Sequence, residues 1–373
     1  RASPSGETTE VLAAASWDGR QVFTAEARDG DGIMNDRLEF GVSEVAALEN
    51  YLGLGIDSPE SEPLIEFVLG RGRIWKLGDI NHSSPQVIEP PRGVPSLMGP
   101  GYDVFKTTYA DRPRSILAGA NDGMFHCFHP GTLEEQWAFI PNNLLYKLKK
   151  MRVQDPDCGE YLVHHSFVDG TAAVADVYFD GGWHTVAVSG QGPGWGKDHA
   201  WYYFCVDVTE PGSPRPLWEF TDPESTGETW SVPAIGRLPS TGRWVAFFGS
   251  GYDSDGDADV DLGNHFYCVD IETGAVLFNE PVDEKTDSPF GIQNTIPGAP
   301  ALADTDNDGA VNAVYFGDLL GRIWKIDTTG DPSTWDLVSI YEDPFLHPIV
   351  TKPAIDIDRS DQSVYLYFGS GGD

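Results

Sequence analysis

The sequence has little positive charge. Its 24 lysine and arginine residues are outnumbered by 58 aspartate and glutamate residues, and the net charge is -34. Nucleic acids and anionic membrane surfaces attract clustered cations, so this balance argues against either as a partner. No run of about eighteen apolar residues occurs, and we therefore expect no membrane-spanning helix. The acidity suits an extracellular, cation-rich setting; the alternative explanation is a solvated surface in a saline habitat.

Cysteine is also scarce, with 4 residues in a chain of 373. So few cannot define a disulfide framework at this length, and no Cys-x-x-Cys pair supports a zinc, haem or thioredoxin-like site. Cys127, Cys205 and Cys268 lie in similar aromatic contexts, so we expect them on equivalent strands as small apolar residues. Cys158 lies in a loop sequence, and a bridge from it to a strand cysteine stays open.

Glycine (42 residues) and aromatic side chains (12%) are abundant, which favours a large all-β unit. From about residue 64 a pattern recurs: a short strand opening with proline, an apolar strand ending in glycine, and an aromatic strand closed by an acidic turn. A fourth strand with an aromatic residue often follows. Four short strands per unit, repeated unevenly, are typical of β-propeller blades. We predict an all-β, modified and irregular β-propeller with uneven blades, insertions and five or six units.

Residues 1–63 are the least regular part, and we interpret them as an N-terminal segment leading into a propeller that spans residues 64–373. The last strand pattern reaches nearly to the final residue, so we expect the propeller to be incomplete at that end and the chain to be an ordered part of something longer. Within the repeats, residues 142–151 predict a helix whose leucines face the protein and whose lysines face solvent, the lysines being Lys147, Lys149 and Lys150.

Residues 304–312 (Asp-Thr-Asp-Asn-Asp-Gly-Ala-Val-Asn) specify a chemistry by their spacing. Side-chain oxygens fall at positions 1, 3, 5 and 9 of an EF-hand-type calcium loop, from Asp304, Asp306, Asp308 and Asn312. Gly309 occupies position 6, where the sharp turn needs glycine, and Ala310 can offer its carbonyl from position 7. Tyr315 replaces the bidentate glutamate at position 12, and both flanks read as strands. We therefore predict a calcium clip on a β-hairpin, in which a cation offsets the repulsion between three carboxylates.

Other stretches offer weaker candidates. Residues 253–261 carry acids at alternate positions and are the rival calcium site, although their glycine falls at position 4 instead of 6. His126 and His129 flank Cys127 on one strand, and we interpret them as core or surface residues because two histidines without further ligands do not make a metal site. His82, Ser83 and Ser84, with Asp79 nearby, contain hydrolase-triad residue types, but sequence neighbours do not make a triad.

Five motifs occur in a fixed order: residues 76–85 (Lys-Leu-Gly-Asp-Ile-Asn-His-Ser-Ser-Pro), 119–126, 139–141, 248–252 and 317–324. Together they resemble the C-terminal β-propeller of the PilC/PilY family, the type IV pilus tip adhesins and biogenesis factors. The resemblance covers roughly residues 65–370. It implies a modified propeller at the pilus tip or outer-membrane surface, association with minor pilins, and contact with a host or abiotic surface. It also implies a single calcium site that regulates pilus extension against retraction.

The calcium loop of this family has alternating Asp or Asn ligands and a backbone carbonyl. Position by position, the resemblance carries these roles to Asp304, Asp306, Asp308, the carbonyl of Ala310, and Asn312. Asn312 departs from the pattern, because an acid is common there, and one charge fewer should weaken the affinity for calcium. No stretch matches the von Willebrand A-like domain found in many members, and no Arg-Gly-Asp motif supports integrin binding.

The turns Thr273-Gly274 and Thr329-Gly330 also resemble those of quinoprotein propellers, so a dehydrogenase that uses pyrroloquinoline quinone is the alternative. Such an enzyme needs a vicinal cysteine pair or convergent charged groups to hold its quinone, and the sequence has no vicinal pair. We therefore expect a non-enzymatic protein of the type IV pilus tip or assembly machinery. With Ca2+ bound, it would act as an adhesin and as a regulator of pilus extension and retraction.

Overall fold

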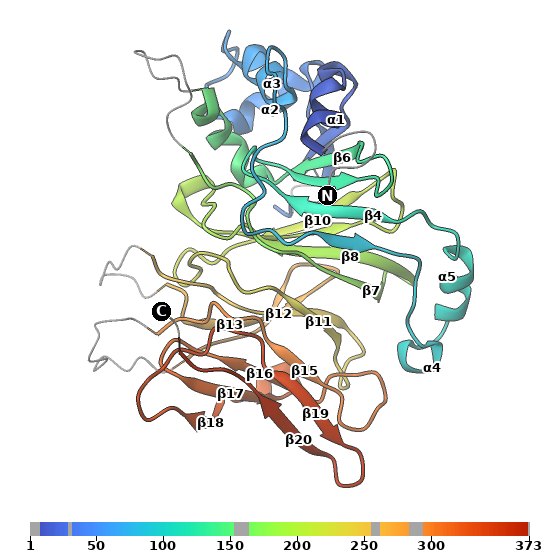
Figure 1. Cartoon of the computed structure of the whole chain (residues 1–373), viewed down its shortest axis with the longest axis vertical. Coiled ribbons are helices and arrows are strands. Elements are labelled where there is room, and N and C mark those ends of the chain that lie inside the picture. Colours follow the sequence, from blue (N-terminus) through green and yellow to red (C-terminus); the bar gives the residue numbers. More distant parts are fainter. Residues whose placement is uncertain (1–7, 29–31, 153–163, 255–261, 283–293, 372–373) are drawn as a thin grey trace.

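The computed structural model describes residues 8–28, 32–152, 164–254, 262–282 and 294–371 of the 373-residue chain. Most of the regular structure is β-strand, arranged in five sheets that follow one another in chain order. Figure 1 shows these sheets succeeding one another along the long axis of the molecule, with the N-terminal helices at one end. No helix in these ranges is both long and apolar enough to cross a bilayer.

The sheets differ in size, and their neighbouring strands are antiparallel except for β1 and β6, which are parallel. The first, in spatial order, consists of β2 (Asp36–Glu39), β1 (Val22–Glu26), β6 (Glu135–Ile140), β5 (Phe125–Phe128), β4 (Ser115–Gly119) and β3 (Gln86–Ile88). The second is β10 (Arg215–Phe220), β9 (Tyr203–Asp207), β8 (Gly182–Gly190) and β7 (Ala173–Phe179). The third is β11 (Ala234–Arg237), β12 (Trp244–Gly249), β13 (His265–Asp270) and β14 (Val276–Pro281). The fourth is β15 (Ala301–Ala303), β16 (Ala313–Gly317), β17 (Arg322–Asp327) and β18 (Val338–Glu342), and the fifth is β19 (Ala354–Asp358) with β20 (Ser363–Tyr367).

The strands β3, β7, β11, β15 and β19 adjoin one another in that order, so each sheet contacts the next through its inner strand. Four of them, β7, β11, β15 and β19, line a cavity of about 580 Å³. Four-stranded sheets whose inner strands surround a shared channel are the blades of a β-propeller. The predicted irregular, all-β propeller is therefore confirmed, and its uneven blades are visible in the strand counts of the sheets.

Aromatic side chains fill the space between neighbouring sheets. Phe125 of the first sheet packs against Phe204 of the second at 5.4 Å between ring centroids, and Tyr203 stacks on Phe248 of the third at 4.0 Å. Phe266 and Phe316 stack across the third and fourth sheets at 3.9 Å. Burial of such rings is the main favourable contribution to the packing of one sheet on the next. Cys127, Cys205 and Cys268 are buried and unbridged on β5, β9 and β13, as predicted; Cys158 lies outside the described residues.

Four strands end in a glycine that leaves room for the segment entering the next sheet. A Cβ on Gly119, Gly190, Gly249 or Gly317 would lie 2.5, 2.3, 2.2 or 2.4 Å from a carbonyl oxygen of that segment, belonging to Val168, Thr229, Ile296 and Ile349 respectively. Real Cβ atoms do not approach a carbonyl so closely, because the overlap is strongly repulsive. The glycine-ended strand of the repeat is therefore a packing requirement between blades.

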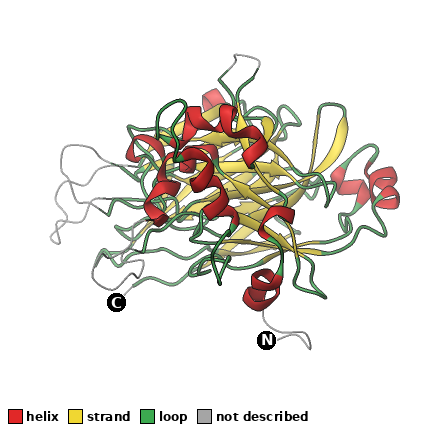
Figure 2. Cartoon of the chain, turned by 90° about the horizontal axis from the view of Figure 1, so that it is seen from above, coloured by secondary structure: helices red, strands yellow, loops and turns green. Residues whose placement is uncertain are grey.

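The N-terminal segment belongs partly to the first sheet, since β1 pairs in parallel with β6. Its helices are α1 (Thr8–Ala14), α2 (Val45–Leu52) and α3 (Ser61–Leu69), with short 3-10 turns η1 (Trp17–Gly19) and η2 (Val42–Glu44). Figure 2, seen from above, shows helices covering this end of the sheets. The boundary that we predict between residues 63 and 64 stays a prediction, while the segment itself is joined to the first blade by β1 and β2.

The predicted helix at residues 142–151 is instead a 3-10 helix, η3 (Asn142–Arg152). A 3-10 helix has three residues per turn, so Lys147 follows Leu144 on one face and is 1% exposed, contrary to the outward orientation that we predict from the sequence. Its ammonium group donates to the carbonyls of Ser166 (2.6 Å) and Trp195 (3.0 Å). Burial lowers the pKa of Lys147 to about 7. Two further 3-10 turns are η4 (Lys197–His199) and η5 (Pro332–Thr334).

Residues 89–114, between β3 and β4, form an arm that contains α4 (Pro95–Met98) and α5 (Tyr102–Thr108). Its base packs on the second sheet: Tyr102 and Phe105 are buried beside Trp183, whose indole N–H donates to the carbonyl of Pro100 at 3.0 Å. Figure 1 shows α4 and α5 at the side of the sheets, away from the N-terminal helices. The arm therefore leaves the first blade and extends across the second.

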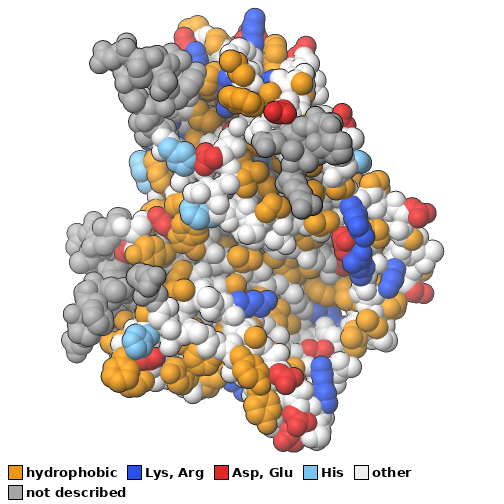
Figure 3. All heavy atoms as spheres, in the orientation of Figure 1, with side chains coloured by type: hydrophobic (Ala, Val, Ile, Leu, Met, Phe, Trp, Pro, Cys, Tyr) orange, Lys and Arg blue, Asp and Glu red, His pale blue; other side chains and the backbone are white. Residues whose placement is uncertain are grey.

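Several large hydrophobic side chains are exposed near the C-terminal sheets. The strand β18 is exposed along its whole length. The exposed residues there and nearby are Val338, Ile340, Tyr341, Phe345, Tyr365 and Tyr367. Figure 3 shows hydrophobic side chains at the end of the molecule where Figure 1 places β18 to β20. The strands β18, β19 and β20 are thus only partly covered by the rest of the described chain.

Candidate metal centre

Residues 304–312 form the connection between β15 and β16, so the acidic stretch is a β-hairpin loop, as its flanking sequence predicts. Ala303 pairs with Ala313 at the base of the hairpin, and the Asn312 N–H donates to the Ala303 carbonyl at 2.8 Å. The corresponding connections are residues 238–243 in the third sheet and 359–362 in the fifth. Both are polar turns that lack the acidic spacing of residues 304–312.

The carboxylate of Asp304 organises the turn. Its Oδ1 accepts the backbone N–H of Asn307 at 2.6 Å and of Asp308 at 3.2 Å, and its Oδ2 accepts that of Gly309 at 2.9 Å. Asn307 and Gly309 both have positive φ, at 63° and 83°, a conformation that Asn and Gly adopt at the least cost. The Asp304 carboxylate therefore stabilises the turn of the loop through these three hydrogen bonds.

Three carboxylates converge in this loop. Asp304, Asp306 and Asp308 each place one oxygen within 4.8 Å of the others, and in the described part of the chain they are the one group of three potential metal-binding side chains so placed. Asp304 is partly buried, whereas Asp306 and Asp308 are exposed. A hard, oxygen-only donor set with more than one negative charge suits calcium, which takes six to eight oxygen ligands. These three residues thus fit the ion that the spacing predicts.

The remaining two predicted ligands lie close by. Ala310 is 2% exposed, and its N–H donates to Asp308 Oδ1 at 2.7 Å. The Oδ1 of Asn312 accepts the N–H of Thr305 at 2.6 Å and its hydroxyl at 3.1 Å, so this side chain ties together the two ends of the loop. The structure gives Asn312 a bracing contact; the metal-ligand roles of Ala310 and Asn312 stay predictions.

Three contacts around the loop are not signalled by the local sequence. Arg237, the last residue of β11, donates from Nη2 to the carbonyl of Asp308 at 2.7 Å. Arg359, in the turn between β19 and β20, donates to the carbonyl of Asp304 at 3.1 Å. Leu97 of α4 lies against Gly309, where an added Cβ would meet its carbonyl oxygen at 2.0 Å. The hairpin is therefore in contact with the third sheet, the fifth sheet and the arm.

The rival candidates do not assemble a site among the described residues. Of the acidic stretch 253–261, residues 255–261 lie outside them, so that stretch stays a prediction. Asp79 bonds to His164, whereas His82 Nδ1 lies 2.7 Å from Asp169, and the hydroxyl of Ser83 accepts the Gly119 N–H. The residue types of a hydrolase triad are thus present without the geometry of one. His129 Nδ1 accepts the N–H groups of its own turn.

His126 belongs to a buried network of four charged side chains that we did not predict. Its ring nitrogens lie 2.7 Å from Glu135 and 3.1 Å from Asp122, and Arg20 donates to Glu135 at 2.7 and 2.8 Å. Burial alone would lower the pKa of His126, but the carboxylates of Asp122 and Glu135 outweigh it and raise that pKa to about 9. Burial would raise the pKa of Glu135, yet Arg20 and His126 lower it to about 2. The network is neutral overall and joins the N-terminal segment to the first blade.

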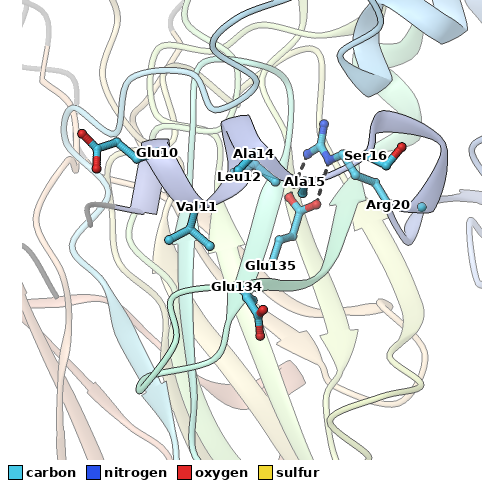
Figure 4. Close-up of a pocket in the computed structure, with 10 residues that line it drawn as sticks. Glu10, Val11, Leu12, Ala14, Ala15, Ser16, Arg20, Glu134 and Glu135 are labelled. Atoms are coloured by element: carbon cyan, nitrogen blue, oxygen red, sulfur yellow. Dashed lines mark hydrogen bonds and ion pairs between the residues drawn. The ribbon is translucent and has the colours of Figure 1, made fainter. Parts of the chain in front are cut away.

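A cavity of about 630 Å³ lies beside this network, between α1 and the turn that precedes β6. Figure 4 shows the Arg20 guanidinium facing the Glu135 carboxylate, with Glu10 well apart from them. Because Arg20 and Glu135 neutralise each other, this pair offers no surplus charge to a ligand. We therefore assign no ligand to the cavity.

The motifs at residues 317–324 and 119–126 each contain a buried aspartate that contacts a side chain four residues later. Asp318, which is 0% exposed, accepts the Arg322 guanidinium at 2.8 Å and the Trp324 indole N–H at 2.8 Å. In the first sheet Asp122 holds His126, also four residues further on. Both motifs therefore place a buried carboxylate that anchors a strand to the turn before it.

The blades, their shared inner channel and the acidic hairpin define a β-propeller with a candidate calcium loop between β15 and β16 of its fourth blade. A family model described as the PilY1 beta-propeller domain matches residues 77–347, and the chain belongs to this family. This confirms the family resemblance of the sequence motifs.

Relatives and a solved structure agree with this membership. The chain is 37% identical over 276 residues to the type IV pilus biogenesis factor PilY1 of Pseudomonas aeruginosa strain UCBPP-PA14, covering 71% of this chain and 22% of that protein. It is 33% identical over 357 residues to a PilY1 homolog of Xylella fastidiosa, covering 89% of this chain and 22% of that protein. The crystal structure of the P. aeruginosa PilY1 C-terminal domain superposes with a TM-score of 0.61 at 26% identity, covering 77% of this chain and 59% of that one. The chain thus spans about a fifth of the length of these curated relatives.

Proposed function

We propose that this chain is the calcium-binding, non-enzymatic propeller of a type IV pilus tip or assembly protein. The observation that carries the proposal is the convergence of Asp304, Asp306 and Asp308 within 4.8 Å on one hairpin. Asp304, Asp306 and Asp308 would hold the ion with their carboxylates, and Ala310 and Asn312 would complete the protein ligands. The ion would supply the positive charge that offsets the mutual repulsion of these carboxylates.

The pilus setting is supported by the relatives, which are named type IV pilus biogenesis factors. On this proposal the protein acts outside the cell, at the pilus tip or outer-membrane surface, with minor pilins as partners and a host or abiotic surface as the target of adhesion. Its calcium site would bias the balance between pilus extension and retraction. The net charge of -34 suits a calcium-containing medium outside the cell.

The non-enzymatic part of the proposal is supported by the burial and pairing of side chains that could otherwise act as acids, bases or nucleophiles. His126, Asp122 and Glu135 are buried and paired with one another, and Cys127, Cys205 and Cys268 are buried thiols. Burial raises the pKa of the Cys127 thiol to about 12, so it is not a thiolate nucleophile at neutral pH. For the quinoprotein alternative, an absorbance titration with pyrroloquinoline quinone decides: a stoichiometric bound-quinone band would contradict our proposal.

Calorimetry tests the calcium site directly. We expect calcium titrated into the whole chain to bind at one site, and the Asp306→Asn/Asp308→Asn double variant to lose the binding heat, because two of three charged ligands become neutral. Asp356→Asn/Asp358→Asn is a matched control, since these acids lie on the hairpin of the next sheet and outside the loop. Undiminished binding in the 306/308 variant would rule out our site assignment.

A further inference from the structure

The arm of residues 89–114 is a connection of the first blade that reaches the acidic hairpin of the fourth. Its base is fixed, because Tyr102 and Phe105 are buried beside Trp183 of the second sheet. Its tip, α4, is less buried: Leu97 and Met98 are partly buried, Met98 against the core cluster of the base, and Pro95 and Ser96 are exposed. The tip therefore has fewer buried contacts than the base, which favours local opening without unfolding of the blades.

Two contacts of the tip involve Gly309 of the 304–312 loop and Arg237, which is bonded to that loop. Gly309 fits under the Leu97 carbonyl, where a Cβ would be 2.0 Å from that oxygen. Arg237 donates from Nη2 to the Asp308 carbonyl at 2.7 Å and to the Leu97 carbonyl at 3.4 Å. One guanidinium on the third sheet thus connects the backbone of the loop to the backbone of the arm (Figure 1 shows α4 near this side of the sheets).

Asp308 and Gly309 lie where the loop meets Arg237 and the arm, and their backbone N–H groups are bonded to the Asp304 carboxylate. Asp304 accepts the N–H groups of Asp308 and Gly309, and Asp308 contributes a carboxylate to the cluster. Without a cation the three carboxylates repel one another, and a change in their separation would displace the backbone at residues 308–309, which is bonded to Asp304. A cation that holds the carboxylates together also holds the surface on which Leu97 rests.

We propose that calcium in the 304–312 loop latches the tip of the arm onto the fourth blade, with Arg237 as the connecting residue. This inference rests on the proposed calcium site. It adds a structural consequence of binding, namely that the first, third and fourth blades become linked at one end of the propeller when the ion is bound. Linkage requires that the effect be reciprocal, so an arm held in place strengthens calcium binding.

Hydrogen exchange on the whole chain, with and without calcium chloride, tests the latch. The amides to follow are those of Leu97, Met98 and Gly99, which donate to Val94 and Pro95 within α4. We expect calcium to slow their exchange by about fivefold or more, the lower range of allosteric coupling. The amides of α5 next to Tyr102 and Phe105 serve as the internal reference, because the packed base should respond little.

The Arg237→Gln variant distinguishes the effect of calcium on the arm from calcium binding itself. It keeps all three carboxylates, so calorimetry should still detect calcium binding, weakened by about fivefold or more, while the calcium response of the α4 amides disappears. Arg243→Gln is the matched control, because Arg243 belongs to the same β11–β12 hairpin but pairs with Asp270 at 3.3 Å. It should behave as the wild type does.

The outcomes separate the two proposals. If calcium binds the wild type and α4 exchange does not change, or if Arg237→Gln retains the full response, the latch is wrong and the calcium site stands. If calorimetry detects no calcium binding at the loop, the proposed function fails, and the latch fails with it.

Discussion

Aspartate has two structural roles in this protein. Asp122 and Asp318 form buried ion pairs, whereas Asp304 accepts backbone N–H groups in a turn. The carboxylates of Asp122 and Asp318 are fully buried and meet charged donors, His126 and Arg322, so they are neutralised within the fold. Asp304 instead accepts backbone N–H groups and shares its hairpin with two further acids. Buried charges are retained only when they are paired. The surplus of negative charge on one exposed hairpin therefore supports our proposal of a bound cation there.

The buried His126 predicts a pH dependence of stability. Because its pKa is raised to about 9 in the folded protein, its contribution is complete below its ordinary pKa of 6.5 and is lost as the pH rises through 9. For the shift of about 2.5 units the contribution is about 3 kcal/mol. The advantage of the wild type over His126→Gln in urea unfolding should therefore shrink by about 3 kcal/mol between pH 6 and pH 10.

The comparison uses a variant because Lys147 titrates in the same range with the opposite sign. Its lowered pKa of about 7 makes stability rise with pH above 7. That effect is present in both proteins and cancels in their difference. A gap between wild type and His126→Gln that is independent of pH would contradict the assignment of His126 as a buried, protonated residue.

Among the elements, the strands with the strongest sequence signal are buried on both faces. β12 and β16 are buried along their whole length, and both carry the apolar run ending in glycine that marks the repeat. Two strands outside the repeat pattern have a weaker signal: β18 is exposed throughout, and β7 is mostly only partly buried and pairs with β8 through a turn at Asp180, with φ at 48°. Edge and partly exposed strands lack a hydrophobic signature, since their position depends on the neighbour with which they pair.

The glycine at the end of β12 predicts a specific steric cost. Gly249→Ala places a Cβ 2.2 Å from the Ile296 carbonyl, in the segment leading into the next blade. We expect a loss of about 1–3 kcal/mol in the free energy of unfolding, as for other overpacked sites. Gly212→Ala is the control, because nothing lies within 4 Å of its Cβ position, and it should change stability by about 0.5 kcal/mol or less.

Denaturant unfolding of the two glycine variants gives the measurement. Equal stability of Gly249→Ala and Gly212→Ala would show that the blades can separate at this point without cost. It would also remove the physical reason that we give for the glycine-ended strand in the repeat.

For the molecule as a whole, the sequence could predict the convergence of carboxylates on the hairpin but not the surroundings of the hairpin. Asp304, Asp306 and Asp308 are close in sequence, so their spacing alone brings their carboxylates together. Leu97, Arg237 and Arg359 contact the loop from far along the chain, and only the arrangement of blades places them there. Lys147 shows the same limit, since the choice of a 3-10 helix and the aromatic surroundings decide its burial. Contacts between distant segments depend on topology, which local patterns do not encode.

The account depends most on an ion in the 304–312 hairpin, and a crystal structure of the chain grown with calcium chloride tests that claim most directly. We predict one strong density peak at the hairpin, bound by oxygens of Asp304, Asp306 and Asp308 among six to eight ligands at about 2.3–2.6 Å. A hairpin closed by its own hydrogen bonds with no ion, or calcium bound only at residues 253–261, would contradict it.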